Sequence, residues 1–378
     1  MRFPSCMFLL FLALATWVSA TFVYAEKTPL DLNQLKLPEG FHIAVFADVP
    51  GPRMLTFTPG GVLLASESGE GKVVALPDAG HAGKADRVVG VLSGLNEPHG
   101  IAFYQGKLYV AENDKVRRYD WDESNLRATN PRAVADLPDG GGHSTRSILF
   151  HGGKMYISAG SSCNACIEKD PRRATVMEFN PDGSGQKIFG MGLRNAVGLA
   201  VSPKTDTVWV TVNGRDWLGD DLPPETIYDL GKGNVDAGWP YCYGDRVPDP
   251  NFTKAGENRC QSVIEPKVLM QAHSAPLGLA FYEGSMFPPE YRNNIFVAFH
   301  GSWNRSVPTG YKVVRVKLDS KGQPVGGPED FITGWLAPNE TKKGRWMGRP
   351  VGIAFGADGS MYLSDDAGGV IYRIAWGK

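Results

Sequence analysis

The stretch Gly100-Ile-Ala-Phe-Tyr-Gln-Gly-Lys-Leu-Tyr-Val-Ala111 contains two apolar runs of strand length on either side of a short turn that includes glycine. This pattern predicts a β-hairpin. The opening phrase of the stretch, four mostly small or apolar residues, recurs six times along the chain. The copies occupy residues 54–57, 100–103, 147–150, 198–201, 278–281 and 352–355. The sequence therefore predicts that one hairpin-based unit is repeated along the chain.

The spacing of the copies indicates the architecture. Successive copies start 46, 47, 51, 80 and 74 residues apart, and most continue into a third apolar run such as residues 72–76. A further run of strand length, such as residues 85–92, precedes each copy after the first. Periods of about 40–50 residues with four strands are typical of β-propellers. We predict an all-β, six-bladed β-propeller with four-stranded blades. A β-sandwich is the alternative, but six copies in phase favour the propeller.

The last copy lacks room for a complete blade. It begins at Gly352 and the chain ends at Lys378, so its fourth strand is missing. Residues 41–47, which precede the first copy, form a matching apolar strand. We expect this N-terminal strand to complete the last blade and close the ring, which removes the open sheet edges.

The first 25 residues have the features of an export signal. Arg2 provides the positive start, residues 7–17 are almost continuously apolar, and small residues at 23–25 form a cleavage site, with 18–20 as a second candidate. The apolar run is shorter than the ~20 residues that a membrane-spanning helix needs. We predict a signal peptide at 1–25, a single propeller domain at 26–378, and a secreted or periplasmic protein without a membrane span.

The cysteine count fits an oxidising compartment. Four cysteines follow the predicted signal, and they allow three connectivities: Cys163, Cys166, Cys242 and Cys260. We favour two disulfides between sequence neighbours, Cys163–Cys166 and Cys242–Cys260. A redox motif is the alternative for Cys-x-x-Cys. Covalent c-type haem is excluded because Ile167 stands where that attachment needs histidine.

Charge and missing motifs exclude several functions. Lys and Arg total 39, Asp and Glu total 40, and no stretch gathers like charges, so nucleic-acid binding is not expected. The chain has no Gly-x-Ser-x-Gly, phosphate-loop or His-Glu-x-x-His motif. It also lacks a Gly-x-Gly-x-x-Gly match before a helix, which argues against a nicotinamide enzyme.

Polar residues concentrate in the loops just before the repeated phrases, whose ends should converge on the propeller axis. Residues that directly precede a phrase are Arg53, His99 and Arg146, and those three or four residues before one are His143, Arg194 and Arg349, with Asn195 beside Arg194. Arginines without matching carboxylates repel each other, and bidentate guanidinium groups suit carboxylates. This pattern predicts an anion site. The alternative is a set of channel residues bonded to one another and to water.

A second polar loop follows the fourth copy. Residues 212–225 contain three aspartates and a glutamate. Oxygen-rich loops suit Ca²⁺, although this one lacks EF-hand spacing. A solvated acidic loop is the alternative reading.

Seven motifs together resemble the glucose/sorbosone dehydrogenase family, whose members depend on pyrroloquinoline quinone (PQQ). They lie at residues 142–146, 192–200, 213–216, 233–240, 275–278, 298–305 and 348–352, and so extend over nearly all of residues 26–378. Each motif alone is weak, but their order along six blades is specific. Residues 298–305 bring the chain closer to the sorbosone and fungal pyranose dehydrogenase branch.

The resemblance implies a quinoprotein that holds PQQ, a tricarboxylate, and Ca²⁺ on the axis. It makes His143 the general base for a sugar hydroxyl whose hydride passes to PQQ, and electrons then leave to an external acceptor, a quinone or a small redox protein. It places Arg194 and Asn195 on the cofactor, with Arg53 and Arg349 as carboxylate clamps. His99 and Arg146, from the axial set, are further cofactor-binding candidates.

The resemblance also assigns Ca²⁺ to the backbone carbonyls of Gly214 and Arg215. Here the chain departs from the soluble glucose dehydrogenase branch, which has proline where Arg215 stands. A ligand provided by the backbone carbonyl does not depend on which side chain stands at this position. That branch also uses a lysine where this chain offers His300 and Arg305, which are further cofactor-binding candidates. The choice of sugar stays open because loops at the top of the blades set it.

Three histidines compete for the role of base. His143 follows three glycines that let the backbone approach the axis, and Arg146 should keep its imidazole neutral. An ordinary imidazole titrates near the working pH, where a base is most useful. His99 and His300 are the rivals. Competing functions are a calcium-dependent lactone hydrolase and a non-catalytic binding propeller.

Overall fold

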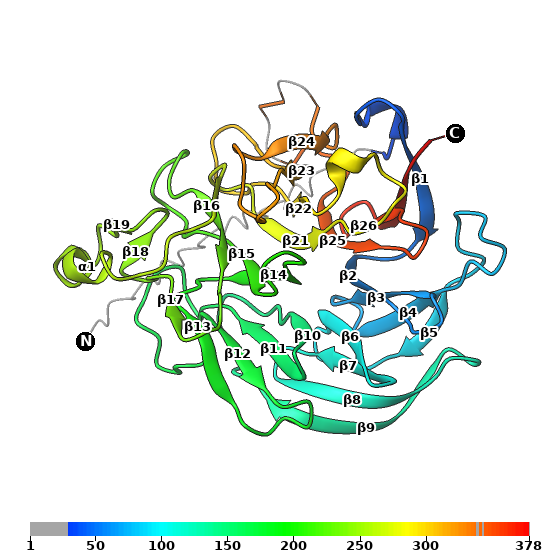
Figure 1. Cartoon of the computed structure of the whole chain (residues 1–378), viewed down its shortest axis with the longest axis horizontal. Coiled ribbons are helices and arrows are strands. Elements are labelled where there is room, and N and C mark those ends of the chain that lie inside the picture. The colour runs from blue at the N-terminus through cyan, green and yellow to red at the C-terminus, as the bar shows by residue number, and fades with distance from the viewer. Residues whose placement is uncertain (1–28, 338–339, 342–343, 378) are drawn as a thin grey trace, which may run out of the picture.

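The computed structural model describes residues 29–337, 340–341 and 344–377. The signal peptide predicted for residues 1–25 lies outside them. Six sheets, each with four antiparallel strands, are arranged in a ring (Figure 1), and the third sheet gains a short fifth strand, Val235–Asp236, in parallel pairing. This confirms the predicted six-bladed β-propeller with four-stranded blades.

Each blade begins with one copy of the repeated phrase as its innermost strand. The first three blades, each given from its innermost strand, are β2 (Pro52–Phe57), β3 (Leu63–Glu67), β4 (Lys72–Leu76) and β5 (Val89–Leu92); β6 (Gly100–Tyr104), β7 (Lys107–Ala111), β8 (Lys115–Asp122) and β9 (Arg127–Asp136); and β10 (Ile148–His151), β11 (Lys154–Ala159), β12 (Thr175–Phe179) and β13 (Lys187–Met191).

The other three blades follow the same plan. They are β14 (Ala196–Val201), β15 (Val208–Val212), β16 (Glu225–Asp229) and β20 (Val268–Met270); β21 (Pro276–Phe281), β22 (Ile295–Phe299), β23 (Lys312–Val316) and β24 (Glu329–Ile332); and β25 (Pro350–Phe355), β26 (Met361–Asp365), β27 (Val370–Trp376) and β1 (Phe41–Asp48). Two short 3₁₀ turns, η1 (Leu32–Gln34) and η2 (Pro289–Tyr291), lie outside the blades.

The ring closes as the sequence predicts. Strand β1 pairs antiparallel with β27, from Phe41 opposite Trp376 to Asp48 opposite Val370. The first and last strands of the described chain therefore share one sheet, and blade 6 has its fourth strand.

The long fourth repeat carries an insertion. Between β16 and β20 lie β17 (Val235–Asp236), β18 (Cys242–Tyr243), β19 (Val247–Pro248) and helix α1 (Thr253–Arg259), and the last three project from the side of the ring (Figure 1). The disulfide Cys242–Cys260 ties this insertion together, and Cys163–Cys166 lies in the loop between β11 and β12. Both predicted pairings are confirmed.

Hydrophobic side chains fill the spaces between neighbouring blades. A large cluster between blades 5 and 6 joins Phe296, Phe331 and Tyr372 to Phe41 of the closing strand. Phe41 packs edge-to-face on Phe331 with ring centroids 5.0 Å apart. Ring closure therefore buries apolar surface as well as satisfying the sheet edge.

Hydroxyl groups connect the innermost strands around the axis. In blade 6, the Ser364 hydroxyl accepts a hydrogen bond from the Gly352 N–H and donates to the Arg53 carbonyl of blade 1. Thr211 does the same between Gly198 and Leu277, at 2.8 Å on each side. Each such side chain satisfies buried backbone groups of two blades, which would otherwise cost stability.

The first residues of four innermost strands bulge. The pairing shifts between Pro52 and Leu55 in β2, and equivalent shifts occur at the start of β14, β21 and β25. Strands β6 and β10 pair with their neighbours without a shift. Because a bulge turns the side chains at its position, the blades present the residues before the repeated phrase differently.

No helix among the described residues has the length and apolar character needed to span a membrane.

The repeated glycines are predicted to be required for close approach of the blades. An added Cβ at Gly352 would lie 2.5 Å from the Arg53 carbonyl oxygen, whereas one at Gly90 in β5 would meet nothing within 4 Å. Overpacking of this kind costs about 1–3 kcal/mol. Gly352→Ala should therefore lower the melting temperature by about 2–10 °C in a thermal scan. The control Gly90→Ala should change it little, and equal melting temperatures for both variants would contradict the packing argument.

Candidate functional site

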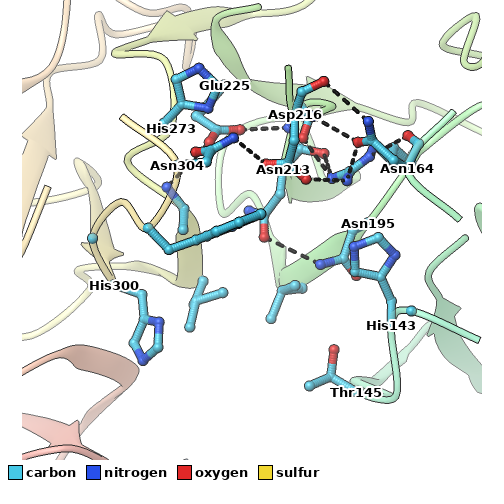
Figure 2. A pocket seen from close by; sticks show the side chains of 18 of the residues that line it. His143, Thr145, Asn164, Asn195, Asn213, Asp216, Glu225, His273, His300 and Asn304 are labelled. Atoms are coloured by element: carbon cyan, nitrogen blue, oxygen red, sulfur yellow. Dashed lines mark hydrogen bonds and ion pairs between the residues drawn. The ribbon is translucent and has the colours of Figure 1, made fainter. Parts of the chain in front are cut away.

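A polar cavity of about 480 Å³ lies where loops of blades 3 to 6 and the start of blade 1 meet. This volume is typical of small-molecule and cofactor sites. Histidine, arginine, asparagine and acidic side chains border the cavity, and Figure 2 shows most of them pointing into one space.

The structure brings most of the predicted site residues together. Those that border the cavity are Arg53, His143, Arg194, Asn195, Gly214, His300 and Arg349. Four others do not border it: His99, Arg146, Arg215 and Arg305. The expectation that the axial residues meet at one place is thus corrected for His99 and Arg146. Arg305, a predicted cofactor-binding residue, also lies outside this cavity, whereas the prediction for Arg215 concerned its backbone carbonyl.

The bulges explain part of this difference. Arg53 lies within the bulge of β2 and borders the cavity, whereas His99 and Arg146 precede the unshifted strands β6 and β10 and are fully buried. Arg146 donates to the carbonyls of Pro138 at 2.6 Å and His143 at 2.9 Å. It therefore supports the loop that carries His143.

The other two arginines are held away from the cavity by carboxylates. Arg215 binds both oxygens of the buried Asp249 at 2.9 Å. Arg305 pairs with Asp221 at 3.0 Å. Neither guanidinium group is directed at a ligand in the cavity.

The cavity arginines differ in how their charge is balanced. Arg53 pairs with Asp366 at 2.6 Å and Arg194 with Asp216 at 3.1 Å, so the expectation of unmatched arginines is wrong for these two. Arg349 donates to the carbonyls of His300 at 3.0 Å and Gly301 at 2.8 Å. Its backbone N–H donates to Asp365 at 2.7 Å, but its guanidinium group forms no ion pair with a carboxylate of the described residues, so Arg349 is the cavity arginine best placed to accept an anion.

His143 has one ring nitrogen fixed and the other directed at the cavity. Its Nδ1 lies 2.9 Å from the Ser161 carbonyl, which can only accept, so Nδ1 carries the proton and Nε2 the lone pair. Burial, followed by the charge of Arg194, lowers the pKa of His143 to about 4. The imidazole is neutral at neutral pH, as expected, but its pKa lies well below the neutral range that the sequence suggested, and Arg146 is a smaller cause than Arg194.

Gly160 leaves the space in which His143 and Asn195 meet. A Cβ at this position would lie 2.5 Å from Asn195 Oδ1 and 2.6 Å from His143 Cβ. Asn195 donates from Nδ2 to Asn213 at 3.2 Å, as Figure 2 shows. Its Oδ1 is buried and has no hydrogen-bond partner within the described chain. Asn195 therefore offers an acceptor to a donor that enters the cavity.

The other histidines at or near the cavity are hydrogen-bonded to protein groups or fully buried. His300 Nε2 lies 2.9 Å from Asp366, and burial lowers the pKa of His300 to about 4 although Asp366 opposes the shift. His273, which the sequence did not single out, contacts the Gly219 carbonyl through Nε2 at 2.8 Å. His99 is inaccessible. Of these histidines, His143 is the one whose ring lies beside Asn195 (Figure 2), and its Nε2 has no hydrogen-bond partner within the described chain.

Asn164 is a site residue that sequence reasoning missed, because the Cys-Asn-Ala-Cys segment was interpreted only as a staple. Arg194 donates to both its backbone and its side-chain oxygen at 2.9 Å. The Asp216 N–H also donates to Asn164 Oδ1, at 2.7 Å. Figure 2 shows these bonds as one network. The disulfide between Cys163 and Cys166, which flank Asn164, thereby helps to hold Arg194 in place.

Glu225 is a second residue outside the predicted set. It is buried at the start of β16 and accepts from the N–H groups of Gly214 at 2.6 Å and Ala275 at 3.2 Å. Burial raises its pKa to about 7 despite these bonds. The acidic composition of residues 212–225 was the signal that could have indicated it.

Oxygen atoms in this corner suit a hard cation. Gly214, Asp216 and Glu225 border the cavity together, and the Gly214 carbonyl accepts from Arg194 at 2.6 Å. Within the described ranges, Cys163, Cys166 and Glu168 are the group whose ligand atoms lie close together. The two sulfur atoms form a disulfide and are not available as thiolate ligands.

Comparisons with known proteins agree on one family. A family model described as TrAA12-like matches residues 35–377. An uncharacterized protein of Borreliella burgdorferi is 30% identical over 96% of this chain and 95% of its own. The pyrroloquinoline quinone-dependent pyranose dehydrogenase of Coprinopsis cinerea is 27% identical over 94% of this chain. The match covers 56% of that enzyme, so the chain spans about half its length.

Solved structures share the fold. The holo form of the PQQ domain of the Coprinopsis cinerea pyranose dehydrogenase has a TM-score of 0.78 and 24% identity, covering 90% of this chain and 97% of the domain. A calcium structure of the family AA12 enzyme of Trichoderma reesei has a TM-score of 0.80 and 21% identity, covering 91% and 97%. Both support the six-bladed arrangement described above.

Loss of the Asn164 side chain should loosen the loop opposite it. In Asn164→Ala the Asp216 N–H loses its acceptor, so its hydrogen exchange should become at least about tenfold faster, the effect of one hydrogen bond. Exchange measured by mass spectrometry over residues 213–217 checks this. Asn180→Ala, at a surface turn of blade 3, is the control. Unchanged protection in Asn164→Ala would show that the network does not hold this loop.

Proposed function

Because the chain belongs to the TrAA12-like family, we propose that it is a PQQ-dependent sugar dehydrogenase. The relative from Coprinopsis cinerea is a PQQ-dependent pyranose dehydrogenase by name. The observation that carries the proposal is the pairing, in one cavity, of an arginine without a carboxylate partner and a neutral histidine whose Nε2 is available. An anionic cofactor and a proton acceptor are the two requirements of this chemistry.

The residues of the cavity fit PQQ. This cofactor is a tricarboxylate, and the guanidinium group of Arg349 donates to carbonyl oxygens, lies near the rings of Tyr311 and Trp346, and forms no ion pair among the described residues. Burial lowers the pKa of Arg349, so a carboxylate that neutralises it offsets a desolvation cost. Asn195 Oδ1 adds a buried acceptor without a partner in the described chain. Arg349, Arg194 and Asn195 are the residues proposed to hold PQQ. Arg53 and His300 also border the cavity and are further candidates.

Calcium is proposed for the corner around Gly214. The Gly214 carbonyl would provide one backbone ligand, and the family resemblance adds the carbonyl of Arg215, a residue that does not border this cavity. Asp216 and Glu225 border it and provide negative charge nearby. Oxygen donors of this kind are those that Ca²⁺ prefers. A cation here would replace Arg194 as the partner of the Gly214 carbonyl and would favour the ionised form of Glu225.

The chain's own part in the reaction is proton transfer and positioning. When bound, PQQ supplies a two-electron acceptor for the hydride that leaves the sugar carbon. His143 Nε2 takes the hydroxyl proton, and the Ser161 carbonyl holds Nδ1–H so that the lone pair stays directed at the cavity. Arg194 lowers the pKa of His143 in the protein described here. A bound carboxylate offsets that charge, so we expect the pKa of His143 to rise in the loaded enzyme.

The competing hydrolase receives no specific support. A calcium-dependent lactone hydrolase would need several free side-chain carboxylates on the axis. Asp216 is engaged by Arg194 and Asn304, and Glu225 by two backbone N–H groups. We further propose that electrons leave to an external acceptor and that the protein works in an oxidising compartment, which suits its two disulfides.

PQQ affinity should depend on Arg349 and on Ca²⁺. Removing a charge-assisted bond costs about 1.5–3 kcal/mol, so Arg349→Ala should bind PQQ about 10–150-fold more weakly in an absorbance titration. Arg305→Ala, which removes an arginine outside the cavity, is the matched control. Chelation of Ca²⁺ should also weaken binding. Wild-type affinity in Arg349→Ala would mean that this arginine serves another purpose.

Turnover should depend on His143 in its neutral form. His143→Gln should retain PQQ but lose about 10²–10⁴-fold in kcat, the usual contribution of a general base. In the wild type, kcat/KM should fall as the pH drops through the pKa of His143, giving a half-point between pH 4 and 6.5. The pH–rate profile and the absorbance of bound PQQ after sugar addition measure both. Near-normal turnover in the variant would move the role to His300, since His99 is fully buried.

A further inference from the structure

Two exposed tryptophans form a pair outside the blades. The exposed fractions of Trp217 and Trp303 are 66% and 58%. Their rings meet edge to face, with centroids 5.3 Å apart and planes at 88°. Trp217 follows β15 in blade 4 and Trp303 follows β22 in blade 5. Large aromatic surfaces left in water usually mark a binding site.

Hydrogen bonds between the two loops fix this pair in place. Asn304 donates to Asp216 at 2.7 Å, and the Ser306 N–H donates to Asp220 at 3.0 Å. Arg305 adds an ion pair with Asp221. Acidic residues of the loop that carries Trp217 therefore accept hydrogen bonds from residues of the loop that carries Trp303. The position of the tryptophan pair thus does not depend on the contact between the rings alone.

The backbone at Trp217 is held in an unfavourable conformation. Its φ is 71°, in the left-handed region that bulky residues rarely adopt. Such a conformation is energetically unfavourable and persists where the surroundings enforce it, often at binding sites. Here it accompanies the exposure of an indole ring to solvent.

The pair stands at the mouth of the cavity. Trp303 borders the cavity and is also more than half exposed, and Asp216 and Asn304, which join the loops, border it too. A molecule that places one end in the cavity and extends toward solvent on this side passes the tryptophans. The neighbouring carboxylates and Arg305 offer hydrogen bonds around an apolar platform.

We propose that Trp217 and Trp303 form a second saccharide subsite, which binds the ring adjacent to the one being oxidised. Sugar rings have an apolar C–H face and a polar rim of hydroxyl groups. This matches an exposed indole pair whose two loops also carry the polar residues Asp220, Asp221 and Arg305. The inference rests on the proposed function and narrows it: the preferred substrate is an oligosaccharide. A docking protein would need roughly 800 Å² of surface and would not require a tryptophan in the cavity wall.

Binding to the protein without PQQ tests the subsite independently of turnover. The probes are glucose, maltotetraose and cellotetraose, titrated by calorimetry and by tryptophan fluorescence. One tetraose should bind about tenfold more tightly than glucose, the scale of one aromatic contact, and Trp217→Ala should lose that advantage. Trp376→Ala, which removes an exposed tryptophan at the end of β27, should keep it. Equal affinity for glucose and both tetraoses in the wild type would overturn the proposal, as would a tetraose preference that survives in Trp217→Ala.

Steady-state kinetics of the PQQ-loaded enzyme tests the second saccharide subsite and the proposed dehydrogenase function separately. The ratio of kcat/KM for the preferred tetraose to that for glucose should fall about tenfold in Trp217→Ala, mainly through KM. Oxidation of glucose with no gain from chain length would refute the subsite and leave the dehydrogenase intact. A loaded enzyme that no sugar reduces would refute the proposed function itself.

Discussion

The close contact of the innermost strands around the axis determines where every functional side chain lies. The repeated glycine brings the backbone of one blade against the next, and an added Cβ at Gly100 or Gly352 would lie 2.5–2.7 Å from backbone atoms of the neighbouring blade. Hydroxyls such as those of Ser364 and Thr211 then satisfy backbone groups of both blades at once. The cavity is assembled from loops of several blades, so its geometry depends on this shared packing more than on any one loop.

Charge within the cavity is arranged in two ways. Arg53 and Arg194 each have a carboxylate partner, which fixes their positions and balances part of their charge. The guanidinium group of Arg349 donates to carbonyl oxygens and forms no ion pair within the described chain, so its charge remains available to an anion. His143 remains neutral beside these cations because burial and Arg194 act in the same direction on its pKa. Binding an anion and accepting a proton are therefore compatible in one small space.

The periodicity of the sequence repeats was sufficient to predict the blades and the closing strand. Both disulfides were predicted because their cysteines are close along the chain. Side-chain direction at the axis was not predictable in the same way. Arg53, His99 and Arg146 occupy equivalent places before the repeated phrase, yet only the first follows a bulged start of its strand and borders the cavity. Asn164 and Glu225 were missed because their roles come from hydrogen bonds to residues far along the chain, which no local pattern records.

The closing strand has a consequence for how the protein is made. Among the blade strands described, β1 is synthesised first and its partner β27 last, so five blades can form before β1 has a strand to pair with. The open edge of an unfinished sixth blade accepts any strand of suitable sequence. When many copies of the chain fold close together, the β1 strand of another copy can pair with this edge as well as the chain's own β1 strand can. Exchange of β1 between copies, giving domain-swapped dimers, is therefore the characteristic assembly error of this topology.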